Sequence, residues 1–399
     1  MRGTRLWLTM TALCVAIGCL ASCDSKRPLL YDVEIAPATI SPNADGIADV
    51  ARIKYSVARR AMVSVYLVDA LGGRHVLREQ AARPPGTYEA LFSGVVADRL
   101  LPDGSYLCVF EAVGDGADVA RKELPLTLEG GEPTHIEILN LTIHPPILTP
   151  NRDGISDRVT IGYYLTKEAT KVQVYLLGAD GKRYPLPEDK IRPVGQQGNH
   201  EHDYEGEVDR GATPPPDGDY EVVVEAEDAV GNRQVVRGTL TIKNGGVPQV
   251  EIVNRAATWS SGVVPLGEVL SFTCTVRNIG NVGVRTKGPP PGTLYNTSEN
   301  FNSKEMYEEP GVFRVGLDYD GNSSGRQYPF RWQLGRDDEL TDIDGYLYLM
   351  PGQAVEVVGH LRIVDVPVTI APYHWIGLIH EQVQIVMDRV EASPISVGF

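Results

Sequence analysis

One acidic turn occurs twice in the sequence and offers side chains that could bind a divalent cation. The first copy spans 40–49 and reads Ile-Ser-Pro-Asn-Ala-Asp-Gly-Ile-Ala-Asp, and the second spans 148–157 and reads Leu-Thr-Pro-Asn-Arg-Asp-Gly-Ile-Ser-Asp. Amide and carboxylate oxygens at alternating positions around a central glycine are typical of Ca²⁺-binding loops. The candidate ligands are Asn43, Asp45 and Asp49 in the first copy, and Asn151, Asp153 and Asp157 in the second.

A structural interpretation explains the same turn without a metal ion. The Asn and the first Asp can bond backbone N–H groups within the turn, and Gly46 and Gly154 supply the positive φ that such a turn requires. Neither copy has the distal Glu of an EF-hand loop, because Arg52 and Thr160 stand at that position. Ca²⁺ takes about six to eight oxygen ligands, so backbone and water oxygens would have to complete the shell. Ca²⁺ is therefore the one cofactor that the sequence suggests, and the hydrogen-bonded turn is the alternative.

Other chemistry-bearing groups are less well placed. His200 and His202 alternate along the chain, so a zinc ion could bridge them on one face of a strand, but no third ligand is evident and an exposed polar loop is favoured. The acidic residues around Asp342 and Asp344 are interpreted as a solvated loop. The sequence contains no Gly-x-Ser-x-Gly elbow, no phosphate-binding glycine loop and no Cys–His constellation. We therefore predict that the chain is not an enzyme.

Aromatic residues gather in the C-terminal part of the chain, and three of them are candidates for contact with a ligand. Tyr319, Tyr328 and Trp332 lie in a stretch rich in Gly, Asn, Ser, Tyr and Asp. Exposed aromatic rings can form a platform for a sugar or a protein partner. The alternative, which the residue types favour, is that these rings belong to a core or an interface between domains.

The N-terminal residues carry the features of an exported lipoprotein. Arg2 and Arg5 precede an apolar run over 6–20, which is too short to span a bilayer and indicates a signal peptide. The run ends in Leu-Ala-Ser-Cys at Cys23 and resembles the bacterial lipobox. That resemblance implies a signal peptide over 1–22, a lipid on the Cys23 thiol and a tether over 23–31. The alternative is an ordinary secretory signal with a chance cysteine. We expect an extracytoplasmic protein anchored to a membrane, at the cell surface or facing the periplasm.

Charge and cysteine content restrict the partners. The net charge of −15 disfavours contact with nucleic-acid phosphates, so no nucleic-acid partner is expected. Cys108 and Cys274 are the cysteines that remain beyond the signal peptide and the lipobox, and they fall in different predicted domains. A disulfide between them is not expected, and a buried free thiol is the default for each.

Repeated segments divide the chain into three predicted domains. Val-Glu-Ile or Ile-Glu-Ile begins each of them at 33–35, 136–138 and 250–252. Gly-Gly-x-Pro precedes the second and third, which predicts flexible linkers. The boundaries are 32–131, 132–245 and 246–399. Short alternating segments separated by turns, over about 100 residues, predict all-β immunoglobulin-like sandwiches in tandem.

The first two domains share further motifs. The shared motifs are the acidic turn, a Tyr-bearing strand, a Val-x-Val-Tyr strand, a Gly-x-Arg turn, and Asp-Gly-x-Tyr at 103–106 and 217–220. This combination resembles the FlgD-like immunoglobulin-like domain of bacterial hook-capping and exported surface proteins. The resemblance implies an Ig-like sandwich over 32–131 and another over 132–245, and it implies a spacer or an assembly surface rather than catalysis.

The third domain lacks the acidic turn. Its segments 265–280 and 350–360 resemble a CARDB-like adhesion module, which implies another β-sandwich. Between them, 285–345 is expected to be a long insertion of loops, and long loops are often functional. The predicted function is a lipid-anchored, non-enzymatic envelope or cell-surface protein. In it, an Ig-like stalk presents the C-terminal domain for adhesion or envelope assembly, with an envelope protein or polysaccharide as partner. The alternative is an accessory polysaccharide- or solute-binding lipoprotein that uses the 285–345 loops.

Overall fold

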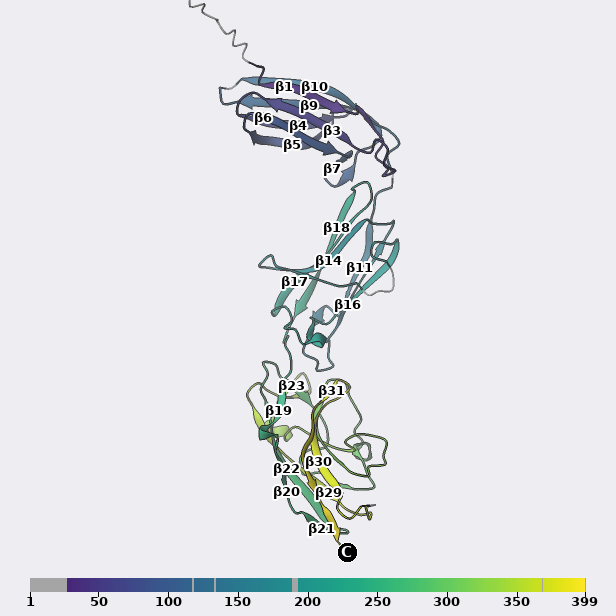
Figure 1. The fold of residues 1–399 in the computed structure, drawn as a ribbon, viewed down its shortest axis with the longest axis vertical. Helices are drawn as coiled ribbons and strands as arrows, with labels where there is room; N and C mark the ends of the chain where they lie inside the picture. Colours follow the sequence, from purple (N-terminus) through teal and green to yellow (C-terminus); the bar gives the residue numbers. More distant parts are fainter. Residues whose placement is uncertain (1–26, 117, 133, 189–192, 368, 399) are drawn as a thin grey trace, which may run out of the picture. The chain divides into compact units, whose positions relative to one another are not determined.

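Three separate apolar cores organise the chain, and each lies between two β-sheets. The computed structural model describes residues 27–116, 118–132, 134–188, 193–367 and 369–398. It contains strands and short 3₁₀ helices and divides into two compact units between residues 133 and 134. The prediction of an all-β protein of several Ig-like sandwich domains in tandem is confirmed (Figure 1). The predicted signal peptide and Cys23 lie outside the described residues, and no helix among the described residues has the length and hydropathy needed to cross a membrane.

The first sandwich packs a three-stranded sheet on a five-stranded sheet. The smaller sheet has the order β1 (Leu30–Ala36), β3 (Ala51–Val57), β6 (Gly86–Phe92). The larger sheet has the order β2 (Thr39–Ile40), β10 (Val119–Leu128), β9 (Gly104–Gly114), β4 (Ala61–Val68), β5 (Arg74–Arg83), and a small hairpin joins β7 (Val95–Val96) to β8 (Arg99–Leu100). Alternate residues of these strands face inward, as the period of two requires.

The second sandwich repeats the strand order of both sheets, with a short helix in place of the β7–β8 hairpin. Its smaller sheet has the order β11 (Ile138–His144), β13 (Val159–Leu165), β16 (Gly198–Tyr204). Its larger sheet has the order β12 (Ile147–Leu148), β18 (Arg233–Ile242), β17 (Gly218–Glu227), β14 (Lys171–Gly178), β15 (Arg183–Pro185), and η1 (Val208–Arg210) follows β16. In both sandwiches the two-residue strand after the first long strand pairs in parallel with the last strand. The duplicated motifs thus correspond to a duplicated fold.

The third sandwich has a different topology. One sheet has the order β19 (Val250–Ile252), β22 (Val269–Asn278), β29 (Ala354–Arg362), β24 (Leu294–Asn296), with β20 (Thr258–Trp259) beside β22. The other has the order β27 (Thr341–Ile343), β28 (Tyr346–Leu349), β23 (Val284–Thr286), β25 (Phe313–Tyr319), β30 (Tyr373–His380), β31 (Gln384–Pro394), with β26 (Phe330–Gln333) beside β25. β21 (Val263–Pro265) pairs with β32 (Ser396–Gly398), and the short helices are η2 (Val253–Arg255), η3 (Phe301–Lys304) and η4 (Asp337–Glu339).

The segment 285–345 differs from the expected insertion of loops, because it builds a large part of the third core. Five of the strands listed above, β23 to β27, fall wholly or partly within it. Phe313, Val315 and Leu317 of β25 and Phe330 of β26 are buried in the core. The alternation expected of a strand is absent in β25, because polar residues such as Arg314 and Asp318 are buried on its other face. A strand buried on both faces lacks the alternation that identifies a strand in a sequence, which is the physical reason for the difference.

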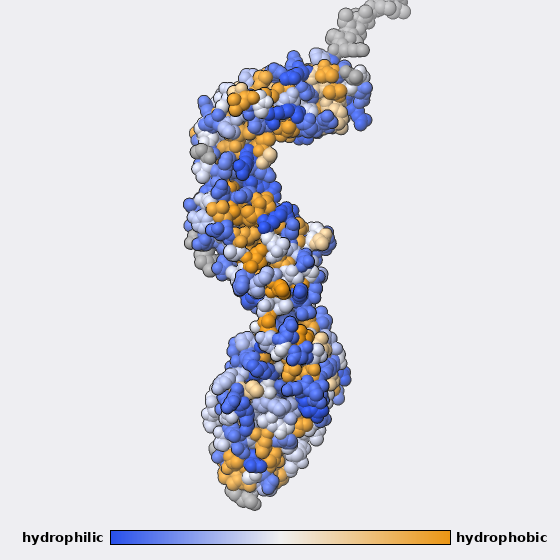
Figure 2. Space-filling model, turned by 180° about the vertical axis from the view of Figure 1, so that it is seen from behind, coloured by the Kyte–Doolittle hydropathy of each residue, from blue (hydrophilic) through white to orange (hydrophobic). Residues whose placement is uncertain are grey.

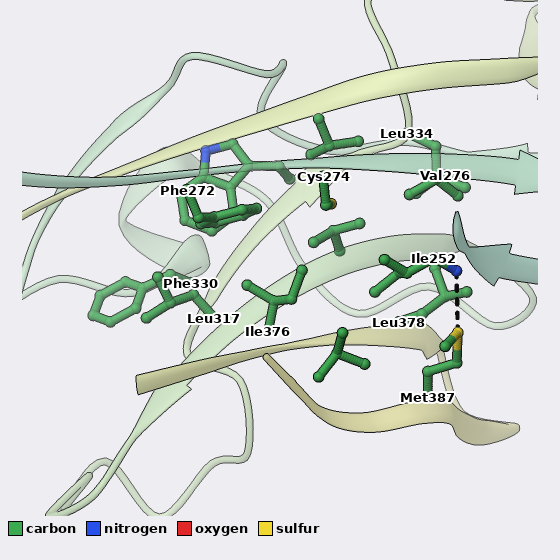
Figure 3. Close-up of a cluster of buried hydrophobic side chains, with 14 of the residues drawn as sticks. Ile252, Phe272, Cys274, Val276, Leu317, Phe330, Leu334, Ile376, Leu378 and Met387 are labelled. Atoms are coloured by element: carbon green, nitrogen blue, oxygen red, sulfur yellow. Dashed lines mark hydrogen bonds between the residues drawn. The ribbon is translucent and has the colours of Figure 1, made fainter. Parts of the chain in front are cut away.

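Both remaining cysteines are free and buried, as expected. Burial raises the pKa of the Cys108 thiol, and likewise that of Cys274, to about 12, so both are inert at neutral pH. Cys274 lies in the third core beside the ring of Phe272 and the side chain of Val276 (Figure 3). The same view shows the backbone N–H of Ile252 directed at the Met387 sulfur, 3.0 Å away.

The repeated Pro-Asp-Gly-x-Tyr motif closes the end of each Ig-like sandwich. The Tyr106 and Tyr220 hydroxyls donate to the carbonyls four residues upstream, at 2.7 and 2.6 Å respectively, which is the tyrosine corner of immunoglobulin folds. Asp103 accepts the N–H groups of Gly130 and Gly131 at 2.8 and 3.0 Å. Asp217 accepts the backbone N–H groups of Asn244 and Gly245 at 2.8 and 3.0 Å. The Gly-Gly segments are therefore fixed to the domains that they leave, which differs from the expected flexible linkers.

The surface is mostly polar. On the face drawn in Figure 2, hydrophilic residues surround separate hydrophobic patches. Among the described residues, Leu71 and Ile370 are the most exposed large apolar side chains. Isolated apolar side chains are ordinary on a soluble surface, so these residues alone do not define an interface.

Candidate functional site

The first acidic turn is closed by its own side chains. Asp49 accepts the backbone N–H groups of Asn43, Ala44 and Gly46, at 3.2, 2.9 and 2.7 Å. The Asn43 side-chain oxygen accepts the N–H of Asp45 at 3.0 Å, and Asp45 accepts the N–H of Ile47 at 2.7 Å. These are Asx-type bonds, in which a side chain replaces a backbone partner two residues away. The turn thus has the hydrogen-bonded geometry of the structural interpretation.

The second turn repeats these bonds. Asp157 accepts the N–H groups of Asn151 and Asp153, each at 3.3 Å, and that of Gly154. Asn151 accepts the N–H of Asp153 at 3.0 Å, and Asp153 accepts the N–H of Ile155 at 2.9 Å. The residues described contain no group of three or more His, Cys, Asp or Glu side chains placed to hold a metal ion. A carboxylate that accepts N–H groups retains further lone pairs, so Ca²⁺ at these turns stays a prediction.

The two turns differ in what covers them. Asn43 and Asp45 are exposed, whereas Asn151 and Asp153 are each only 5 % exposed. The cover is the third sandwich: the Tyr348 hydroxyl in β28 donates to the second Asp153 oxygen at 2.8 Å. The second turn therefore connects two sandwiches. We name the contact of 151–157 with the third sandwich the joint.

Backbone contacts complete the joint. His380 Nε2, at the end of β30, donates to the Arg152 carbonyl at 2.8 Å. A Cβ atom on Gly154 would lie 2.2 Å from the Pro310 carbonyl oxygen, and one on Gly311 would lie 2.1 Å from the Asp153 carbonyl carbon. Both glycines also have positive φ, 82° and 78°. Only glycine allows the two backbones to approach this closely.

Charged side chains surround the joint. The Arg152 guanidinium pairs with Asp209 in η1 at 3.0 Å. Arg285 of β23 donates to the Pro310 carbonyl at 2.7 Å. The residue after His380 is Glu381, which is almost fully buried and paired with Arg314 and Arg331 at 3.1 and 2.8 Å. A buried carboxylate needs such partners, and here they hold the end of β30 in place.

Burial shifts the pKa values of two side chains at the joint in opposite directions. It raises the pKa of the Asp157 carboxyl to about 6, and the neighbouring Asp153 carboxylate adds to the rise, while N–H bonds from Gly154 and its neighbours oppose it. Burial lowers the pKa of His380 to about 4, so this imidazole is neutral at pH 7 and donates through Nε2.

The three candidate aromatic residues do not form one platform. Trp332 is fully buried and donates its indole N–H to the Thr293 carbonyl at 2.9 Å. Tyr328 is 2 % exposed, and its hydroxyl donates to Asp388. Both rings lie within the packed domain and are out of reach of a ligand in solvent, as the core interpretation requires. Tyr319 is partly exposed and lines a cavity.

His200 and His202 lie in β16 and are buried, so the expected exposed polar loop is wrong for this segment. Both rings stack on Tyr163, with centroid distances of 5.1 and 5.7 Å. His202 Nδ1 contacts the Pro187 carbonyl at 3.1 Å. Packing, backbone carbonyls and, for His200, the Glu188 carboxylate account for both imidazoles.

Sequence reasoning missed the joint residues of the third sandwich. Neither Tyr348 nor His380 is among the site residues predicted from the sequence. Both residues lie in strands, and the Tyr348 hydroxyl and the His380 imidazole contact the second turn. The available signal was a pair of polar residues at the ends of otherwise apolar strands.

Comparison with known proteins gives no sequence match and only weak similarity to solved structures. No family model matches the chain, and no curated protein sequence matches it. Fibronectin(III)-like modules of Clostridium thermocellum CbhA are 13 % identical, cover 53 % of this chain and 92 % of their own, with a TM-score of 0.22. A tetra-tandem repeat from the extending region of a large adhesion protein is 15 % identical, covering 92 % and 74 %, with a TM-score of 0.20. A Ca²⁺-stabilized adhesin of an Antarctic bacterium that binds ice is 14 % identical, covering 86 % and 74 %, with a TM-score of 0.22.

Removing one hydroxyl should weaken the joint. In Tyr348→Phe the buried Asp153 oxygen loses its donor, and we expect the unit 134–399 to lose about 1–3 kcal/mol of unfolding free energy. Denaturant unfolding measures the loss, and hydrogen exchange should rise in 151–157 but not in 43–49. Tyr346→Phe, in the same strand with a 41 % exposed side chain, is the matched control. Equal effects of the two variants would contradict the role of the Tyr348 hydroxyl.

Two variants should show opposite pH dependence. The folded pKa of Asp157, about 6, exceeds the ordinary value of 3.8, so its contribution to stability falls as pH rises from about 4 to about 6. The folded pKa of His380, about 4, lies below 6.5, so its contribution falls as pH decreases through that range. The deficit of Asp157→Asn relative to the unsubstituted chain should grow on acidification, by up to about 3 kcal/mol, whereas that of His380→Gln should shrink. Urea unfolding between about pH 4 and pH 7 measures both, and deficits independent of pH would contradict the assignment.

Any Ca²⁺ binding should distinguish the two turns. We expect Ca²⁺ to bind at the exposed first turn. We expect none at the second turn, because the Tyr348 hydroxyl is bonded to the Asp153 carboxylate and the third sandwich covers the loop. Calorimetric titration should give heat that Asp45→Asn abolishes and Asp153→Asn leaves intact. Heat that survives Asp45→Asn would remove the first turn as the site.

Proposed function

We propose that this chain is a non-enzymatic, lipid-anchored extracytoplasmic protein in which the Ig-like sandwiches are a stalk and the third sandwich is the displayed domain. The observation that carries the proposal is the joint. It fixes the third sandwich to the second through a buried side-chain bond and close backbone contact. A display role needs such a fixed connection, because a freely rotating domain would not hold a defined orientation.

The bonded linker supports the same role. The Gly245 N–H is held by Asp217 and the Gly246 N–H by the Pro150 carbonyl, both at 3.0 Å. Pro150 belongs to the second acidic turn, so the turn contacts both the linker and the third sandwich. The FlgD-like and CARDB-like resemblances fit a spacer followed by an adhesion module. Adhesion to, or assembly with, an envelope protein or polysaccharide is the activity that we assign to the displayed domain.

A second candidate function follows from one specific observation. Tyr319 lines a cavity of about 440 Å³ in the third sandwich, together with side chains from the 285–345 segment. An accessory polysaccharide- or solute-binding lipoprotein would use such a cavity. The two functions are compatible, since a displayed domain needs something to bind.

Replacing Cys23 tests the anchor. The lipobox resemblance predicts that Cys23 carries the lipid, so Cys23→Ser should abolish incorporation of a labelled fatty acid and move the chain from the membrane fraction to the soluble fraction. Cys108→Ser removes a buried thiol of the first core and should leave both properties unchanged. Labelling that persists in Cys23→Ser, or an unlabelled chain of natural sequence, would overturn the anchored display role.

A further inference from the structure

We propose that the cavity beside Tyr319 binds a hydroxyl-rich sugar unit, neutral or amino-substituted, and rejects acidic sugars. The inference deepens the display role proposed above and rests on it only for its biological setting. The cavity occupies about 440 Å³, within the range of small-ligand sites. Four segments of the third sandwich line it: 297–300, 319–324, 363–367 and 372–374, with Val397 at the margin.

Three carboxylates give the cavity an excess of hydrogen-bond acceptors. Asp365 accepts the Thr297 hydroxyl at 2.9 Å, and Asp320 accepts the N–H of Tyr373 at 3.2 Å. Glu299 accepts the N–H of Asn296 at 2.9 Å, and this bond and the Lys304 ammonium lower the pKa of Glu299. Each carboxylate is oriented by a fixed donor and retains lone pairs for a ligand.

His374 adds a buried acceptor. It is 2 % exposed and lines the cavity, and burial lowers its pKa, so the ring is neutral at pH 7. Its Nδ1 lies 3.1 Å from the Pro372 carbonyl, and only a protonated nitrogen can bond to a carbonyl oxygen. Nε2 therefore carries the lone pair, and no hydrogen bond to it is found among the described residues. This lone pair is available to a hydroxyl donor of a ligand in the cavity that His374 lines.

The Tyr319 ring forms an aromatic wall beside this imidazole. The two rings are stacked, with centroids 5.6 Å apart and planes inclined by 17°. The Tyr319 hydroxyl makes no hydrogen bond to a described residue, and burial of the ring raises its pKa, so at pH 7 it remains a neutral donor and acceptor. Tyr319 is the one candidate aromatic of the sequence that reaches the cavity.

These groups select the ligand by its donors. Neighbouring sugar hydroxyls can donate to one carboxylate together, and an amino group adds a charged donor. The cations paired with these carboxylates are Lys304, 3.1 Å from Glu299, and Arg389, 3.8 Å from Asp320. A sugar acid would bring a further negative charge to this acceptor-rich site, in a chain of net charge −15. Neutral and amino sugars fit, and uronic acids do not.

Calorimetry on the full chain tests the proposal, in a detergent without a sugar headgroup. The probes are glucosamine oligomers, glucose oligomers and galacturonic acid oligomers of equal length. We expect heat with at least one of the first two and none with the third. If only the glucosamine oligomers bind, and salt weakens their binding, the amino group is the recognised donor. If the glucosamine and glucose oligomers bind with equal affinity, the hydroxyl groups are the recognised donors.

Two pocket variants and one control locate the binding. Asp365→Asn and Tyr319→Phe should each weaken the affinity for the sugar by about tenfold or more, while the midpoint of thermal unfolding stays unchanged. Asp338→Asn makes the same charge change on η4, outside the cavity lining, and should not alter affinity. Absence of heat with all three probes, equal binding of the uronic acid, or full affinity in both pocket variants would each overturn the proposal. The titration does not involve the anchor, so its failure is separate from a failure of the Cys23 experiment.

Discussion

The hydrogen bond from Tyr348 to Asp153 is the interaction on which the arrangement of the second and third sandwiches depends. A buried carboxylate is tolerated only when donors satisfy it, and here the turn itself supplies the N–H of Ile155 while the neighbouring sandwich supplies a hydroxyl. Neither domain satisfies this side chain alone. The polar group therefore specifies which surfaces meet, and the glycine contact between Gly154 and the Pro310 carbonyl determines how closely they do.

Further hydrogen bonds and ion pairs connect this contact to the interior of the third sandwich. His380 donates to the turn, and the next residue, Glu381, carries the buried charge that pairs with Arg314 and Arg331. Such buried pairs contribute little net stability compared with an apolar core, but loss of one partner is strongly destabilising. The joint is thus attached directly to this buried cluster of charges. The sugar-binding cavity lies elsewhere in that domain, at the start of β30, so the attachment and the proposed binding use opposite ends of one strand.

Much of the fold could be predicted from the sequence because the signals were local. The Asx turn, the Asp-Gly-x-Tyr motif and the alternating strands each depend on a few neighbouring residues, and all occur twice. The joint could not be predicted, because the two turns carry nearly the same motif and differ in what covers them. The segment 285–345 was misjudged because β25 is buried on both faces and shows no alternation. Of the aromatic candidates, Tyr319 alone reaches a cavity, since exposure depends on packing that spacing does not reveal.

The parallel pairing near the two ends of each sandwich has a mechanical consequence. β2 lies parallel to β10, β12 to β18, and β21 to β32, in each case an early strand beside the last strand of its domain. Tension that separates the ends of such a domain acts along these strands, in shear. Their hydrogen bonds then share the load and must break together, whereas a hairpin pulled from its open end unzips one bond at a time. Stretching of each sandwich would therefore load in shear the strands β2, β12 and β21, which are only two or three residues long.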